Sequence, residues 1–344
     1  MAKGAKIKLG CLDKISSLPD SILCRILSSI PIKDAVRTSI LSTRWRYLFA
    51  SMTTLQLDDR CLNHGSVESF MNFGDRLLLF SSEPSLECFQ LVVSWTNRYV
   101  FDSSRVYEWV RAALGHGVKE LDLLIDIKEF MLPTILFTCK SLVTLKLQLG
   151  FRMYVPRGAC FPNLKKLQLT YMKFSDNDSV QRRDYKRDAY KRAATDLLHL
   201  IRNVQSLQFK IDHPETFSNY VRVQILVMSG EAGLAFENLV ELKLTEDVFG
   251  HHKHAEWRGT WVVEFLQCTP NLQTLVLSIE GGHAERGVWT PPKEVPSCLL
   301  SHLKKIVLNQ SWRSLELNSY FLKNARVLEE LSFGINHWYK KKNQ

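Results

Sequence analysis

One arrangement of apolar and polar positions recurs along most of the chain. The pattern is apolar-x-x-apolar-x-apolar, where x is usually a polar residue. An example is Leu142-Val-Thr-Leu145-Lys-Leu147. Residues that alternate in this way have the period of a β-strand with one buried face. The sequence therefore predicts ten short strands, whose last apolar positions are Leu57, Leu91, Leu123, Leu147, Leu169, Phe209, Leu244, Leu277, Leu308 and Phe333.

The spacing of these strands indicates how they are arranged. Successive copies of the pattern begin between 22 residues (Leu142 to Leu164) and 40 residues (Leu164 to Val204) apart. A short strand that recurs every few tens of residues is typical of a leucine-rich-repeat solenoid, so we expect an α/β fold of this kind. The alternative is an ordinary α/β protein whose strands share a leucine-rich composition. Gly150 and Glu280 stand where such repeats usually have Asn or Cys, so we expect a degenerate, irregularly curved solenoid.

The residues between the leucines of each strand are candidates for binding. Each strand of a repeat directs its leucines toward the core and leaves the intervening residues on the concave side. These residues are mostly polar here. We therefore expect a target or ligand to contact the side chains of Lys146, Gln148, Gln168, Lys243 and Thr245.

Helical periodicity fills several of the gaps between strands, as a repeat fold requires. Ser104 is expected to cap a helix that ends at Gly115 or Gly117. Its apolar stripe consists of Val106, Trp109, Val110, Ala113 and Leu114.

Residues 13–52 do not follow the repeat and predict three short helices. Ser17-Leu-Pro-Asp20 supplies a hydroxyl cap, a proline in the first turn and an acidic residue near the positive helix end. Apolar residues then continue at helical spacing from Ile22 to Ile30. The second helix is expected around Lys33–Leu41 and the third after a cap at Ser42. Three short helices cannot bury all of this apolar surface among themselves, so some of it must contact a partner or the repeats.

The segment from Ile15 to Phe49, IxxLPDSILxxILSxIPIKDAVRTSILSTRWRYLF, resembles the F-box of plant F-box proteins. LPD-x-IL, KDAVRTS-x-LS and R-W-R-x-L match that family in order and spacing. The segment departs from it at Thr43, where Lys or Arg is usual, and at Phe49, where Trp is common. Both changes should leave the helices intact.

This resemblance implies that the N-terminal helices dock on a SKP-type adaptor. The positions that match the family's apolar docking residues are Leu18, Pro19, Ile22, Leu23, Ile26, Val36 and Trp45. Ile26, Val36 and Trp45 have an alternative place in the internal core of the three helices.

A second resemblance lies near the C-terminus. VPSCLL from Val295, LKKIVL from Leu303 and FLKNARVLEEL from Phe321 resemble the FBD region that follows leucine-rich repeats in many plant F-box proteins. Residues 312–319 lack the acidic run often found there. The expected organisation is a flexible basic N-terminus (1–12), an F-box (13–51), degenerate repeats (52–290), and an FBD-like region (291–344) that closes the solenoid and ends in a flexible basic tail.

Composition and the placement of the cysteines indicate the cellular compartment and exclude some classes of partner. The chain has 344 residues and a formal net charge of +10, from 45 Lys and Arg against 35 Asp and Glu. Its eight cysteines include no C-x-x-C pair, so no zinc knuckle is predicted, and a chain of this length with its own core is not expected to need a disulfide framework. A reducing compartment, the cytoplasm or the nucleus, is expected. The longest uncharged apolar stretch, Phe265–Ile279, is too short and too polar to span a bilayer, so no membrane partner is expected.

The sequence contains none of the common catalytic motifs, and no cofactor is predicted. His252, His254 and Glu256 would point the same way in an extended loop and could suit zinc, but the alternative is a solvated loop, and no metal site is predicted. The run Arg182–Arg192 carries six basic and two acidic residues. It is either a solvated insertion or a docking patch for an acidic partner or nucleic acid.

Taken with the motifs, the resemblance implies the substrate-recognition subunit of an SCF-type (SKP adaptor–cullin–F-box) ubiquitin ligase. The chain would be non-catalytic, and its partners would be the adaptor, the cullin and RING subunits reached through it, and an unknown target protein. Two other functions stay open. One is a ligand-gated receptor of the same ligase type that holds a small hormone or inositol phosphate; the other is a basic scaffold or nucleic-acid-associated protein, although nucleic acid is not the expected partner. The lysines to inspect for the receptor are Lys146, Lys166, Lys243 and Lys305.

Overall fold

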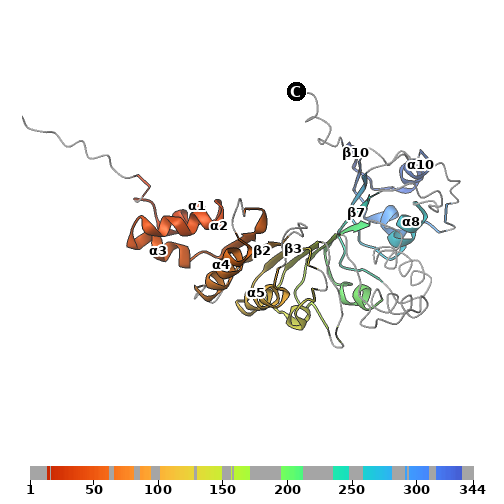
Figure 1. Cartoon of the computed structure of the whole chain (residues 1–344). Coiled ribbons are helices and arrows are strands. Elements are labelled where there is room, and N and C mark those ends of the chain that lie inside the picture. The colour runs from red at the N-terminus through yellow and green to blue at the C-terminus, as the bar shows by residue number, and fades with distance from the viewer. Residues whose placement is uncertain are drawn as a thin grey trace, which may run out of the picture.

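In the computed structural model the chain forms an arc, with a curved β-sheet on the inner side and helices on the outer side (Figure 1). Three N-terminal helices lie at the first end of the arc, and strand β10 lies at the other. The structure describes residues 14–15, 17–61, 66–80, 86–93, 101–127, 130–148, 156, 159–170, 195–211, 235–247, 259–280, 291–292, 294–309 and 315–334.

All ten predicted strands are present among these residues, and they form one parallel sheet in chain order from β1 to β10. Each strand therefore pairs with the strands before and after it in the sequence, as expected of stacked repeats. The strands are β1 (Thr54–Asp58), β2 (Cys88–Val93), β3 (Glu120–Ile125), β4 (Thr144–Gln148), β5 (Lys166–Thr170), β6 (Ser206–Ile211), β7 (Glu241–Asp247), β8 (Thr274–Glu280), β9 (Lys305–Asn309) and β10 (Glu330–Gly334).

The helices form the N-terminal group and the outer side of the arc. The N-terminal group contains α1 (Asp20–Leu27), α2 (Ile32–Arg37), the 3₁₀ turn η1 (Thr38–Ile40) and α3 (Thr43–Ala50). The remaining elements are η2 (Asp59–Cys61), α4 (Val67–Phe80), α5 (Ser103–Gly115), η3 (Thr134–Thr138), α8 (Gly259–Gln267), α9 (Ser297–Ser301) and α10 (Leu315–Asn324). Residues 195–200 are also helical.

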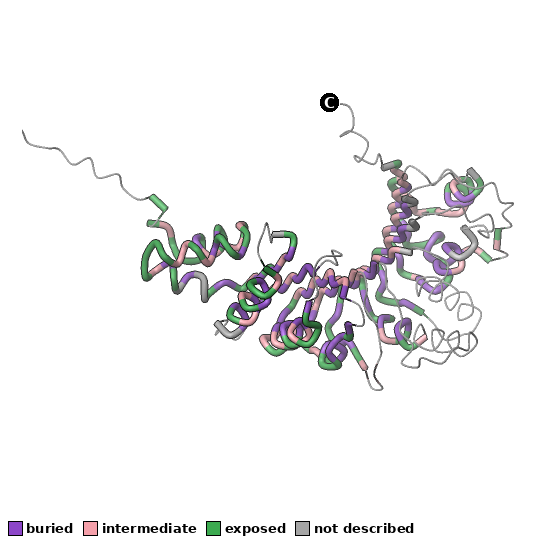
Figure 2. Tube along the Cα trace, in the orientation of Figure 1, coloured by how far each residue is buried: buried purple, intermediate pink, exposed green. Residues whose placement is uncertain are grey.

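The core consists of rows of apolar side chains that the strand register brings together. Leu121, Leu145 and Leu167 occupy matching positions on β3, β4 and β5, and each is at most 2% exposed. A second row, two residues further along each strand, is buried to the same degree at Leu123, Leu147 and Leu169. Figure 2 shows these buried positions alternating with partly exposed ones along the strands. Burying one such leucine contributes roughly 1.5–3 kcal/mol, so the repeated doublet is what stabilises the sheet.

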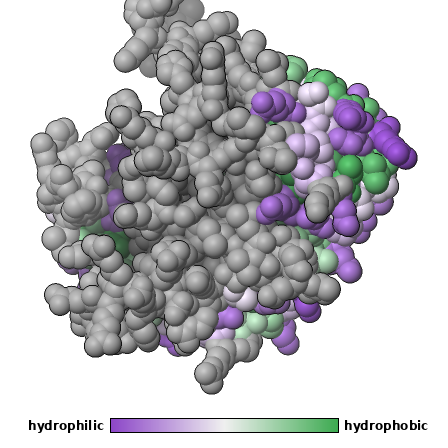
Figure 3. Space-filling model, turned by 90° about the vertical axis from the view of Figure 1, so that its right-hand side faces the viewer, coloured by the Kyte–Doolittle hydropathy of each residue, from purple (hydrophilic) through white to green (hydrophobic). Residues whose placement is uncertain are grey.

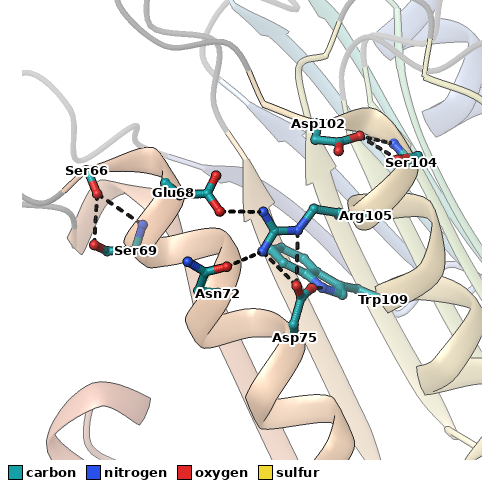
Figure 4. A network of polar contacts seen from close by, with 9 residues as sticks. All are labelled: Ser66, Glu68, Ser69, Asn72, Asp75, Asp102, Ser104, Arg105 and Trp109. Atoms are coloured by element: carbon teal, nitrogen blue, oxygen red, sulfur yellow. Dashed lines mark hydrogen bonds and ion pairs between the residues drawn. The ribbon is translucent and has the colours of Figure 1, made fainter.

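The outer side is held together by polar contacts as well as by packing, most clearly between α4 and α5 (Figure 4). The Arg105 guanidinium donates hydrogen bonds to Glu68, Asn72 and Asp75. The other Asp75 oxygen accepts a hydrogen bond of 2.7 Å from the indole Nε1 of Trp109. One arginine of α5 thus binds three side chains of α4, which fixes the two helices relative to each other.

The start of α5 differs from the prediction. Asp102, not Ser104, is the N-cap residue, and its carboxylate accepts hydrogen bonds from the backbone N–H and the hydroxyl of Ser104. These hydrogen bonds lower the pKa of Asp102. The expected end is correct: α5 ends at Gly115, and Gly117 has a φ of +72° that favours glycine.

The N-terminal helices differ from the prediction at their first cap and first stop. Pro19 occupies the N-cap position of α1 with no side-chain cap, and the Ser17 hydroxyl instead donates to the carbonyl oxygen of Lys14. Helix α1 ends at Leu27 rather than Ile30. Ser42 does cap α3, because its hydroxyl oxygen accepts a hydrogen bond from the backbone N–H of Trp45.

The buried side chains of the N-terminal helices continue into the repeats. Leu27 and Leu48 belong to the same hydrophobic cluster as Met52, Leu55 and the leucines of the sheet. The N-terminal helices therefore share a core with the first repeat.

The two ends of the sheet are not equivalent. On β10, Leu331 is half-buried and Phe333 is 64% exposed, although their register partners Ile306 and Leu308 on β9 are buried. Among the described residues, no strand pairs with the far side of β10. The side chains of Leu331 and Phe333 are therefore covered by a neighbouring strand on one side only. Hydrophobic and hydrophilic side chains are intermixed on the described surface at this end of the molecule (Figure 3).

Candidate functional site

The N-terminal helices carry the densest group of exposed apolar side chains in the described part of the chain. Five of its eleven exposed large hydrophobic residues lie there, before residue 42. Ile40 is 85% exposed, Leu41 66%, Ile15 57%, Ile22 44% and Ile26 41%. Exposed apolar side chains concentrated in one short segment of a folded protein are typical of an interaction surface. We call these five residues the N-terminal apolar surface.

The predicted adaptor-binding residues divide into a surface group and a core group. Pro19, Ile22 and Ile26 are exposed, while Leu18 and Val36 are half-buried. Leu23 and Trp45 are buried, at 0% and 8% exposure. The helical phase explains this difference: Leu23 and Leu27, four residues apart on α1, face the core, while Ile22 and Ile26 face solvent.

The burial corrects the placement of Leu23 and Trp45, which support this surface from inside rather than lie on it. Sequence reasoning missed Ile15, Ile40 and Leu41 as surface candidates. Their signal was available, since ISSLP and SIL place apolar residues beside polar ones at the ends of short helices.

Arg44 on α3 fixes the start of α1. Its guanidinium donates to the Asp20 carboxylate, with Nε at 2.9 Å, and to the carbonyl oxygen of Leu18 at 2.6 Å. Sequence reasoning included Arg44 only as part of the R-W-R motif and assigned it no role. Its contacts hold Leu18 and Pro19 in place at the edge of the N-terminal apolar surface.

A wide, open pocket of about 640 Å³ lies where α1 and α3 meet β1. Its lining includes Asp20, Cys24 and Arg25 of α1, Arg44 of α3 and Thr54 of β1. Burial and the nearby Asp20 carboxylate raise the pKa of the Cys24 thiol. Because the thiolate is the nucleophilic form, this cysteine is poorly suited to covalent chemistry.

The second candidate surface is the inner face of the sheet, where the register aligns one residue from every strand into rows. The first row contains Thr54, Cys88, Glu120, Thr144, Lys166, Ser206, Glu241, Thr274, Lys305 and Glu330. The second row contains Gln56, Gln90, Asp122, Lys146, Gln168, Gln208, Lys243, Val276, Val307 and Ser332.

A third row runs through Gln148, Thr170, Lys210 and Thr245 on β4 to β7. Thr170 and Thr245 are only 5% and 4% exposed. The prediction that Thr245 faces a target is therefore corrected. It is a short side chain flanked in the sheet by Lys210 and Ser278, and it is covered. The other predicted target-facing residues, Lys146, Gln148, Gln168 and Lys243, are half-buried on the inner face.

On β3 and β4 the inner face is acidic. The Lys146 ammonium donates to Glu120 at 2.5 Å and lies 4.0 Å from Asp122, whose carboxylate also accepts a hydrogen bond from Gln90. The hydrogen bond to Glu120 raises the pKa of Lys146, while burial raises the pKa of Asp122. Lys146 is therefore already paired with neighbouring carboxylates. Because it is one positive charge beside two negative charges, this part of the inner face has a net negative charge.

On β5 to β7 the inner face is basic and rich in amides. In the part of the chain that the structure describes, Lys166 and Lys243 form no ion pair, and Gln168 and Gln208 form no side-chain hydrogen bond. The nearby Glu241 carboxylate accepts a hydrogen bond of 2.7 Å from the Ser206 hydroxyl. The two lysines and two glutamines are thus available to a ligand.

On β8 and β9 the second row becomes apolar at Val276 and Val307, which are paired in the register and half-buried. Beside them Lys305 forms an ion pair of 2.8 Å with Glu330. Of the four lysines named for an anionic small ligand, Lys146 and Lys305 are therefore already paired with carboxylates.

The described residues contain no cluster of three His, Cys, Asp or Glu side chains that could hold a metal ion. His252, His254 and Glu256 lie outside the described residues, as does the basic run Arg182–Arg192. Burial raises the pKa of both Cys88 and Cys298 to about 11, so these thiols are protonated at neutral pH. Among the described helices, none has the length and apolar character needed to cross a membrane.

Comparison with protein families finds three regions in the order expected. A model of the F-box domain matches residues 15–56. A model described as the LRR repeats of FBD-associated F-box protein At5g56370 matches residues 106–179, and an FBD model matches residues 291–333.

Similar proteins from Arabidopsis thaliana have names that refer to one or more of these regions. FBD-associated F-box protein At4g10400 is 29% identical over 378 positions, which cover 91% of this chain and 90% of the relative. FBD-associated F-box protein At5g56370 is 40% identical over 178 positions, or 50% of this chain and 40% of the relative. F-box/LRR-repeat protein At3g59200 is 44% identical over 142 positions, or 39% and 26%. The matched segments thus span less than half the length of the last two relatives.

Proposed function

We propose that this chain, an F-box/leucine-rich-repeat protein with a C-terminal FBD region, is the substrate-recognition subunit of an SCF-type ubiquitin ligase. The observation that carries the proposal is the N-terminal apolar surface, because it lies within the matched F-box and is exposed in the isolated chain. Such a surface needs a partner, and a SKP-type adaptor is the partner that an F-box implies.

In this proposal the N-terminal apolar surface docks on the adaptor, and through it on the cullin and RING subunits. The ten strands, of which β9 and β10 lie in the FBD region, belong to one solenoid whose inner face holds the target protein. The chain itself is non-catalytic. It raises the rate of ubiquitin transfer by holding target lysines near the conjugating enzyme, which is an effect of proximity. The complex would act in the cytoplasm or the nucleus, which a fluorescent fusion would test.

The test is co-purification of the full chain with a plant SKP-type adaptor. We expect wild type to form a stoichiometric complex, and Ile26→Ser with Ile40→Ser to lower adaptor affinity at least about tenfold, as loss of central apolar contacts does. The matched control is Ile135→Ser on the outer side, because Ile135 is 42% exposed and Ile26 is 41% exposed.

Two results would contradict the proposal: a wild-type chain that binds no such adaptor, or equal recovery from wild type and the double variant. Equal losses in the control and the double variant would show that solubility rather than docking had changed. An apolar contact should also depend little on salt, whereas nucleic-acid binding would weaken steeply as salt rises.

A further inference from the structure

The inner face of the sheet is divided into zones of different chemistry along the arc. It is acidic on β3 and β4, basic and amide-rich on β5 to β7, and apolar on β8 and β9. We infer that it binds an extended segment of the target protein, with acidic residues at alternate positions over β5 to β7 and apolar residues over β8 and β9. This inference rests on the proposed function, since it describes the target that the repeats would hold.

The lysines of the basic zone are the reason to expect acidic side chains in the bound segment. Lys166 is exposed and Lys243 is half-buried, and they lie two strands apart in adjacent rows. Neighbouring strands are about 4.8 Å apart, and alternate side chains of an extended peptide repeat about every 7 Å. The Cα atoms of the two lysines, two strands and one row apart, are therefore separated by about 12 Å, and carboxylates at the alternate positions i and i+4 of a peptide that crosses the strands, about 13 Å apart, can reach both ammonium groups. Each contact would be a charge-assisted hydrogen bond.

The glutamines favour a polypeptide chain as the ligand. Gln168 and Gln208 lie side by side in the second row, directly before Lys243. Each carboxamide presents both a donor and an acceptor, which matches the N–H and C=O groups of a peptide backbone.

The composition of the rows disfavours single-stranded nucleic acid. The first two rows contain no aromatic residue on which bases could stack, and Glu120 and Asp122 would repel a phosphate backbone that continued over β3 and β4.

The neighbouring zones fix where the segment lies. Val276 and Val307 offer apolar contact on the side of higher strand number. Glu120 and Asp122, with only Lys146 between them, repel acidic residues on the other side. The third row is covered at Thr170, so the segment lies over the first two rows. Five strands from β5 to β9 span about 19 Å, the length of about six extended residues.

The experiment selects a displayed library of random ten-residue peptides on the immobilised full chain, without adaptor. We expect enrichment of peptides with Asp or Glu at alternate positions next to Val, Ile or Leu. A labelled copy of an enriched peptide, measured by fluorescence anisotropy, should bind Lys166→Glu with Lys243→Glu at least about tenfold more weakly than wild type. The matched control is Lys33→Glu with Lys140→Glu, since both lysines are exposed, lie elsewhere and change the net charge equally.

Three outcomes would overturn the inference: enrichment without acidic residues, an acidic peptide whose affinity the first double variant leaves unchanged, or equal weakening by both double variants. The last would show a response to net charge alone. Adaptor co-purification of the same variants separates this test from the proposed function. A Lys166→Glu, Lys243→Glu chain that still binds adaptor but fails to bind peptide supports the inference, while loss of adaptor binding in wild type removes only the ligase role.

Discussion

Replacing Gly74 with alanine is expected to loosen the contact between α4 and α5. A Cβ atom at this position would lie less than 3.0 Å from three atoms of the Trp109 ring, Cζ2, Cε2 and Cη2. The ring has little room to move, because Trp109 is 3% exposed, packs edge-on against Phe70, and donates its Nε1–H to Asp75.

Two opposing effects decide the magnitude. Alanine is a better helix former than glycine by about 1 kcal/mol. Overpacking a filled site costs about 1–3 kcal/mol, and weakening a hydrogen bond to a carboxylate costs about 1.5–3 kcal/mol. The clash therefore outweighs the propensity, and we expect a net local destabilisation of about 2 kcal/mol.

Hydrogen–deuterium exchange measures this local effect without requiring that the whole chain unfold in one step. A loss of about 2 kcal/mol corresponds to exchange about 30-fold faster in the peptides that cover α4 and α5. Gly115→Ala is the matched control, because its Cβ would meet nothing within 4 Å, and its protection should stay the same or rise. Trp109→Phe should relieve the clash and reduce the effect of Gly74→Ala. Unchanged protection in Gly74→Ala, with the control behaving as expected, would refute this reasoning.

Two further predictions concern titratable groups. Asp102→Ala removes the cap of α5 and should destabilise that helix by about 1 kcal/mol near neutral pH, with Ser103→Ala as the control in the same exchange assay. Hydrogen bonds to Ser104 lower the pKa of Asp102 in the folded state, so its contribution is present above the unfolded value of about 3.9 and is lost as pH falls through the lower, folded pKa. Asp102→Ala and wild type should therefore converge in acid, and a difference that persists there would argue against the assignment. Cys298, with a pKa of about 11, should be alkylated far more slowly at pH 7.5 than the exposed Cys160, and equal rates in the folded chain would contradict its burial.

The strands were predictable because their signal is local. Leu145-Lys-Leu147 shows its buried and exposed faces within three residues, and the same phase repeats in every copy. The identity of each surface residue was less accessible. Leu23 and Ile22 are adjacent on α1, and it is Leu23 that belongs to the same core cluster as Trp45 and Leu48 of α3, while Ile22 is exposed.

Longer-range contacts explain the other differences. Asp102, Ser103 and Ser104 are all good caps, and the choice depends on which backbone N–H groups the helix leaves free. Thr245 has the alternation of an exposed position but is covered in the folded chain. The ion pair between Lys146 and Glu120 joins two strands, and the two residues are 26 positions apart in sequence. The sequence pattern of a single strand cannot predict it.

The alternation of the strands separates the residues that maintain the fold from those that face solvent. On β6, Leu207 and Phe209 are buried while Gln208 between them is not, and the same holds for Lys243 between Leu242 and Leu244. Substitutions at solvent-facing positions usually change stability by less than about 0.5 kcal/mol. If the inner face holds the target as proposed, a duplicated gene can acquire a new target preference one side chain at a time, because each change there leaves the apolar rows behind it intact.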